Sequence, residues 1–214
     1  SDVTGPTSRS GLQFAFAKHL PVSDGSGKFS IGIETRLFQF GIDKNKLSAT
    51  LGNDPILAGA QTRTKFDAGL GFAYSNDKLQ VGVSVAQMVQ SKLDFYTGSS
   101  TPSTEGRLYR HFYLHSNYRI NVGGETTIVP NFLLIYLPST STTEFQIGTR
   151  IERNLFWWGI GLRSQQSFML SAGINVSKNF NIGYGYDNYI NPISTFDGNA
   201  TGHELLLRYK FSKK

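Results

Sequence analysis

The stretch FDAGLGFAY, residues 66–74, alternates between two kinds of side chain. Phe66, Leu70 and Phe72 belong to its large apolar set, and Asp67 and Gly69 belong to its polar or small set. Successive side chains of a β-strand point to opposite faces, so this period of two predicts a strand whose faces differ in character.

The same alternation recurs along the whole chain. Its further apolar positions are Leu12, Phe14, Phe16; Phe29, Ile31, Ile33; Leu79, Val81, Val83, Val85; Phe112, Leu114, Tyr118; Phe145, Ile147, Ile151; Phe156, Trp158, Ile160, Leu162; Phe168, Leu170, Ala172, Ile174; Phe180, Ile182, Tyr184, Tyr186; and Leu205, Leu207, Tyr209. Together with the run 126–137, they predict about eleven strands in one all-β domain spanning residues 1–214. Pro130 lies in that run and cannot donate a ladder hydrogen bond, so we expect a bulge or local break there.

The composition favours an antiparallel transmembrane β-barrel over a soluble β-sandwich. Mean hydropathy is −0.24, but a barrel strand hides its lipid face by alternating it with polar residues. Charged residues make up 17%, where about a quarter is usual in soluble proteins. Aromatic residues recur near the expected strand ends, as at Tyr74, Tyr136 and Trp158, which is the depth that amphipathic rings prefer in a membrane. The chain has no cysteine and therefore no disulfide.

The connections between expected strands alternate between short and long. Outer-membrane barrels have short periplasmic turns and longer external loops, so this alternation predicts a periplasmic C-terminus. The first expected strand then runs inward, and one or three strands before it would bring the total to twelve or fourteen. The chain begins at Ser1 without Met, so we also expect a signal peptide and early strands to have preceded it.

Charged and histidine side chains on the non-apolar faces are candidates for a barrel lumen. These lumen-facing candidates are Glu34, Arg36, Asp67, His111, His115, Arg119, Glu144, Arg150 and Arg163. Cross-strand ion pairs explain the carboxylates among them better than acid–base catalysis does. His111 and His115 are about 13 Å apart along an extended strand, too far to chelate one metal. We therefore expect no catalytic residue, cofactor or metal site. The net charge is +6, but the Lys and Arg residues are scattered along the chain. Because a nucleic-acid-binding surface needs them clustered, we expect no nucleic-acid partner.

The C-terminal third resembles the ending of the PorP/SprF family. The matching segments are Asn181-Ile182-Gly183-Tyr184-Gly185-Tyr186-Asp187 and the final strand from Gly202 to Phe211, with His203, Glu204, Tyr209 and Phe211 at positions typical of the family's barrel-closing strand. Upstream, residues 14–17, 30–33 and 81–85 resemble the same family in the same order. The family's Asn-Pro-Ala-Tyr-like early motif is missing, and Ser212 to Lys214 follow the terminal Phe211.

This resemblance implies a non-enzymatic outer-membrane protein of the type IX secretion system. Such proteins are associated with gliding motility and with docking secreted adhesins through a type B C-terminal domain, and some are linked to a periplasmic peptidoglycan-binding protein. The segments 41–63, 87–106 and 188–200 are the candidate docking loops. A porin-like channel for small solutes is the alternative, with the charged lumen side chains setting its selectivity. A barrel enzyme and a soluble β protein rank below these two.

Overall fold

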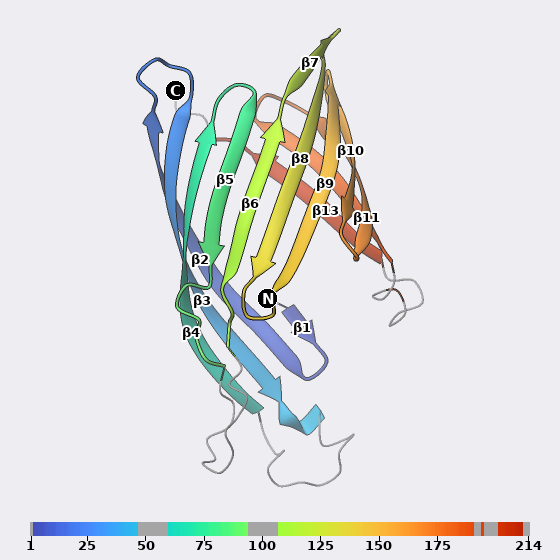
Figure 1. The fold of residues 1–214 in the computed structure, drawn as a ribbon. Helices are drawn as coiled ribbons and strands as arrows, with labels where there is room; N and C mark the ends of the chain where they lie inside the picture. The colour runs from blue at the N-terminus through green and yellow to red at the C-terminus, as the bar shows by residue number, and fades with distance from the viewer. Residues whose placement is uncertain (1, 47–59, 94–106, 191–193, 195–200, 212–214) are drawn as a thin grey trace.

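A computed structural model describes residues 2–46, 60–93, 107–190, 194 and 201–211 (Figure 1). Its strands are β1 (Asp2–Thr4), β2 (Thr7–Pro21), β3 (Lys28–Asp43), β4 (Ala60–Ser75), β5 (Leu79–Ala86), β6 (His111–Tyr118), β7 (Ile120–Gly123), β8 (Thr126–Leu137), β9 (Thr142–Arg153), β10 (Phe156–Arg163), β11 (Ser167–Asn175), β12 (Phe180–Tyr189) and β13 (Thr201–Tyr209). Within these residues no helix is long and apolar enough to cross a membrane.

All the described strands form one antiparallel sheet, which confirms the all-β prediction. Each strand pairs with its neighbour in sequence, except that β7 continues the path of β6 alongside β8. With β6 and β7 taken as one arm, the eleven expected strands are present, and the short β1 is additional. The sheet curls so that β10 to β13 lie behind β8 and β9 in Figure 1.

The sheet is not closed into a full barrel. On one edge, β2 pairs with β1 only through Thr7 to Arg9, and its backbone from Ser10 to Pro21 has no second neighbour among the described strands. On the other edge, β13 pairs with β12 alone among the described strands. Whether the complete barrel has twelve or fourteen strands therefore stays a prediction.

The two ends of the sheet carry different connections. The end that joins β2–β3, β4–β5, β7–β8, β9–β10 and β11–β12 has only connections of six residues or fewer, and we call it the turn end. The opposite end, the loop end, carries the three longest connections, residues 44–59, 87–110 and 190–200, together with short ones at 5–6, 138–141 and 164–166. At the turn end, the amide of Ser26 donates to the Asp24 carboxylate at 2.8 Å. The hydrogen bonds from the Ser26 side chain and amide lower the pKa of Asp24.

The break expected at Pro130 lies in the neighbouring arm. β8 runs through Pro130, which faces Thr149 of β9 in regular register. On its other side, β6 pairs with β8 as far as Asn131 and β7 resumes at Ile128, so the gap around Arg119 falls opposite Pro130. Because proline has no N–H to offer on that side, the ladder is interrupted where the donor is missing.

The strand register shows where the outward apolar face begins and ends. At the loop end Leu12, Leu37 and Phe66 form its first row, and at the turn end Leu20, Phe29 and Tyr74 form its last. From Leu12 to Leu20 is nine residues, matching the 9 to 11 residues that a tilted strand needs to cross a bilayer. We call the surface between these two rows the apolar band.

β2, β3 and β4 continue past the apolar band at the loop end. The next outward rows are Ser10–Gln39–Thr64 and Ser8–Gly41–Thr62, which are polar or small. In Figure 1 these three strands reach well below the loop ends of β5, β6 and β8. We call residues 7–11, 38–43 and 60–65 the β2–β4 extension.

Candidate functional site

The inner face of the sheet, opposite the apolar band, carries most of the paired charges among the described residues. On β3, the Arg36 guanidinium pairs with the Glu34 carboxylate, two residues away on the same face. Gln13 of β2 donates to the other Glu34 oxygen at 2.6 Å. The candidates Glu34 and Arg36 therefore belong to one polar group, and Gln13 joins it across the strand pair.

A second group connects β9, β10 and β12. Arg163 lies between two carboxylates, 3.7 Å from Glu144 and 3.5 Å from Asp187. Gln166 donates to Glu144 at 2.6 Å. Asp187 was not among the predicted lumen residues, although it follows the apolar Tyr186 in the alternating pattern and so has a recognisable inward position.

A third group lies nearer the turn end. Arg119 contacts the Glu152 carboxylate at 2.6 Å, and Arg150 pairs with the other oxygen of the same carboxylate. Of the carboxylate pairs, Arg163–Glu144 and Arg119–Glu152 join different strands or segments, whereas Glu34–Arg36 and Arg150–Glu152 lie within one strand. Such mutual pairing neutralises the inner wall and leaves few unpaired charges among these residues.

Trp157 of β10 packs flat across the inner face of its neighbouring strands. A Cβ added at Gly173 of β11 or at Gly183 of β12 would lie 2.4 Å or 2.6 Å from its ring. The Arg150 guanidinium lies over the same ring, 5.5 Å from its centroid. Only glycine therefore fits beneath the indole, and the side chain is 8% exposed. The sequence showed two glycines at inward positions but not the indole above them.

The two candidate histidines do not meet. The His111 Nδ1 is 2.8 Å from the Tyr109 carbonyl oxygen, and its ring stacks against Tyr113. His115 lies across the inner face of Gly82, where an added Cβ would fall 2.5 Å from the imidazole. Among the described residues no group of three His, Cys, Asp or Glu is placed to hold a metal ion.

Asp67 faces inward but is fully buried. Its carboxylate accepts hydrogen bonds from the amides of Ala68 at 2.7 Å and Val89 at 3.1 Å. Val89 belongs to the segment after β5, where Gln87 and Gln90 have positive φ. Asp67 therefore fastens this segment to β4 rather than lining open space.

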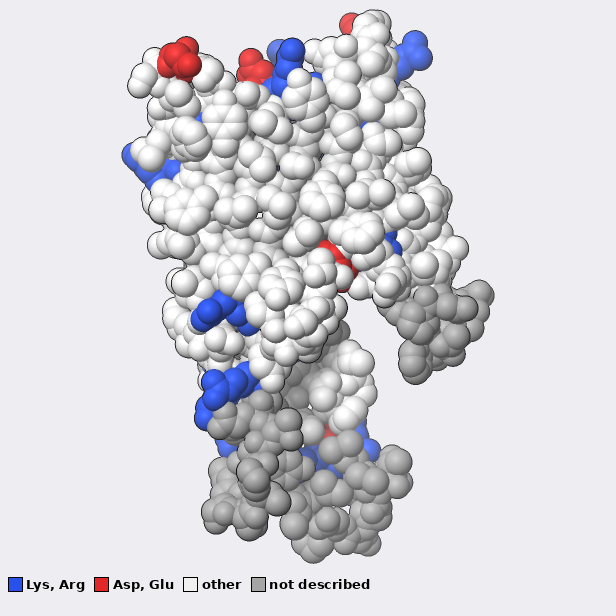
Figure 2. Space-filling view, in the orientation of Figure 1, with Lys and Arg blue, Asp and Glu red and all other residues white. Residues whose placement is uncertain are grey.

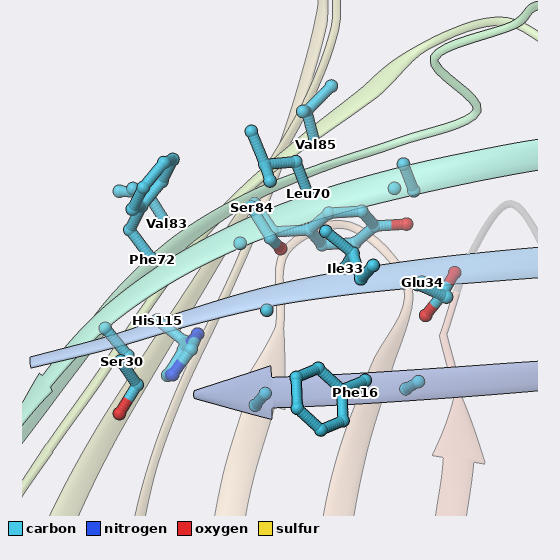
Figure 3. Close-up of a pocket in the computed structure, with 18 of the residues that line it drawn as sticks. Phe16, Ser30, Ile33, Glu34, Leu70, Phe72, Val83, Ser84, Val85 and His115 are labelled. Atoms are coloured by element: carbon cyan, nitrogen blue, oxygen red, sulfur yellow. The ribbon is translucent and has the colours of Figure 1, made fainter. Parts of the chain in front are cut away.

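Small side chains of β2 to β5 leave a cavity of about 620 Å³ on the inner face (Figure 3). Ala15, Gly32, Gly69 and Ser84 form part of its floor. Ser30, Glu34 and His115 also line it. The inner face of β2 to β5 is thus lined mainly by small side chains, whereas the inner face of β9 to β12 carries more charged side chains.

The expected closing strand is an edge strand in this structure. His203 lies on the outward face, with its Nδ1 2.5 Å from the Tyr184 hydroxyl. Glu204 lies on the inward face beside a cavity of about 310 Å³ that Arg150 and Arg163 also line. Tyr209 ends β13, and its ring contacts Phe211, which lies beyond the strand and is 90% exposed.

The candidate docking loops lie largely outside the described residues. The structure describes their strand-proximal parts, including residues 41–46 and 87–93. Their role stays a prediction.

Comparison with known proteins places this arrangement in a family. No curated protein matches the chain significantly. The family model described as "Type IX secretion system membrane protein PorP/SprF" matches residues 1–209, nearly the whole chain. This family is one of secretion-system membrane proteins, not of enzymes, and an all-β sheet with an apolar outward band fits it. The chain belongs to the PorP/SprF family of type IX secretion system membrane proteins.

Proposed function

We propose that this chain is a non-enzymatic outer-membrane component that docks a secreted, adhesin-type cargo at the cell surface through the cargo's type B C-terminal domain, in support of gliding motility. The β2–β4 extension carries the proposal. A strand needs 9 to 11 residues to cross the membrane, whereas β2 has 15 residues and β3 has 16. The surplus forms a wall outside the lipid, on the same side as the long loops.

The inner face of the extension suits protein contact. The Arg9 guanidinium is 4.5 Å from the ring centroid of Phe38 and 5.4 Å from that of Phe40. Arginine and aromatic side chains are enriched at the centres of protein interfaces, because they combine a large apolar contact area with directional polar groups. This face therefore offers a compact anchor point beside the barrel mouth.

The first test is capture of the cargo from cells that express the full chain. Purification in mild detergent is expected to recover a large secreted partner, and the partner's isolated C-terminal domain should compete for binding. The double substitution Arg9→Ala and Phe40→Ala is expected to reduce recovery at least tenfold, because it removes the arginine and aromatic side chains that would contact the cargo. Lys28→Ala and Lys178→Ala at the turn end serve as the matched control. Recovery of the intact protein without any secreted partner would refute the docking role.

The proposal also places the loop end outside the cell and the C-terminus in the periplasm. A periplasmic peptidoglycan-binding protein would then meet the turn end. An epitope tag placed after Lys214 should become accessible to antibody only after the outer membrane is permeabilised. Labelling of that tag on intact cells would reverse the orientation.

A channel for small solutes is the second candidate function. The small-residue wall of β2 to β5 favours it, since the cavity of about 620 Å³ leaves room beside the sheet. Steady single-channel conductance in a planar bilayer would support transport, whereas an electrically silent protein would support docking alone.

A further inference from the structure

The outward face of the sheet has a trough along β5. Val83 and Val85 form its floor, and the larger side chains of Phe72, Phe112 and Leu114 on the adjoining strands stand beside them. With Tyr136 these residues border an open depression of about 600 Å³ that is almost wholly apolar. The trough arises because β5 places short side chains between two strands that carry long ones.

The trough lies inside the apolar band. Val83 pairs with Phe72, and Phe72 pairs with Ile31, which is two residues from Phe29 in the last row. Val85 pairs with Leu70. Leu70 lies four residues, or two outward rows, after Phe66, which belongs to the first row. The surroundings of the trough are therefore hydrocarbon, and an acyl chain can fill it without displacing water.

Three cations lie at the loop end of this trough. The Arg110 guanidinium, two residues before Phe112, donates to the Met88 carbonyl at 3.1 Å. Lys92 and Arg107 face each other in a β-bridge just beyond. In Figure 2, which views the outward face of β5 and β6, Lys and Arg lie at both ends of a broad surface without charge, its loop end included.

These cations lie at the boundary of the apolar band, which is the depth in a membrane at which lipid headgroups lie. The Met88 amide donates to the Ala68 carbonyl, and the Ser91 hydroxyl donates to the Phe66 carbonyl at 2.6 Å. Phe66 belongs to the first row of the apolar band, so this segment lies at the band's boundary. Arg110 is held at the same level by its contact with Met88.

We propose that the trough and this cationic cluster bind one phosphorylated lipid. An acyl chain lies along β5 over Val83 and Val85, and the phosphate lies against Arg110, with Lys92 and Arg107 adding positive charge. Guanidinium groups bind phosphate through paired hydrogen bonds. The Arg110 Nε is buried without a hydrogen-bond partner among the described residues, so a small shift of the side chain would bring it to a phosphate. A soluble acidic peptide would match the positive charge but not the apolar trough, whereas a phosphorylated lipid matches both parts.

The test is native mass spectrometry of the full chain, purified in a neutral detergent and titrated with defined lipids. Lipid A bearing two phosphates should remain bound at least tenfold more strongly than phosphatidylethanolamine. Val83→Phe fills the trough and should lower lipid A retention at least tenfold, whereas Val81→Phe, on the same face but outside the trough, should not. Arg110→Ala should also lower retention tenfold, and Arg110→Lys, which keeps the charge, less than threefold. Lys78→Ala at the turn end is the charge control.

The outcomes separate the proposal from ordinary lipid association. Equal retention of the two lipids, or equal effects of Val83→Phe and Val81→Phe, would overturn it. Displacement of lipid A by millimolar inorganic phosphate would show a phosphate site without a lipid and would also overturn it. Because the readout needs no cargo, failure of the docking proposal would leave this result unaffected.

Discussion

Gly183→Ala is expected to lower the free energy of unfolding by about 1–3 kcal/mol, the usual cost of overpacking a tight site. The new Cβ would lie 2.6 Å from Cζ2 of the Trp157 ring, closer than carbon atoms can pack. The indole would have to leave its place, and Arg150 above it would lose its aromatic contact. Urea unfolding of the protein in detergent micelles or lipid bilayers measures the effect.

Gly185→Ala is the matched control for this substitution. It lies on the same strand and face, but its Cβ would meet only the Glu204 Cβ, at an ordinary 3.7 Å. In a Trp157→Ala background the cost of Gly183→Ala should disappear, because the clash has been removed, and a double-mutant cycle isolates that coupling. Equal costs at positions 183 and 185, or no coupling to Trp157, would show that the indole does not lie over Gly183.

Asp67→Ala is expected to release the segment after β5. The Asp67 carboxylate is fully buried and accepts the Val89 amide, and a hydrogen bond to a charged group contributes about 1.5–3 kcal/mol. Limited proteolysis within residues 87–93 should therefore become at least about tenfold faster, since cleavage follows the population of the opened segment.

Asp67→Asn separates the hydrogen bond from the charge. The amide keeps an oxygen at the acceptor position, so cleavage should stay within about threefold of the parent protein. Asp77→Ala, in the β4–β5 turn, controls for the loss of an acidic group elsewhere. If the alanine and parent proteins were cut at the same rate, the tether would have no role in ordering this segment.

The sequence predicted the strands and their two faces because alternation is a local property. Each strand carries its own period-two pattern, so Asp67 and Phe66 could be assigned to opposite faces without knowing any neighbour. The three-residue β1 was missed because a segment that short shows no period. The break was expected at Pro130 but lies one strand away, at Arg119. Proline lacks the N–H that the neighbouring strand would accept, so it is the neighbouring strand whose pairing is interrupted.

The contacts across strands could not be predicted because they depend on register. Trp157 covers Gly173 and Gly183 only because residues 157, 173 and 183 align across three strands. Similarly, Ser8 and Ser10 are ordinary polar residues in the sequence. They mark the end of the apolar band only once Leu12 is aligned with Leu37 and Phe66. The burial of Asp67 depended on an irregular segment with positive φ, for which alternation gives no signal.

The extra length of β2, β3 and β4 makes the rim of the molecule uneven. The β2–β4 extension projects beyond the apolar band. At the same end of the sheet, β10 and β11 are joined by only three residues, 164–166. Under the proposed docking role, the taller side formed by β2 to β4 would block the approach of a large folded partner from that direction. The rim would orient an arriving protein before any specific contact forms, so that the first collision already resembles the docked state.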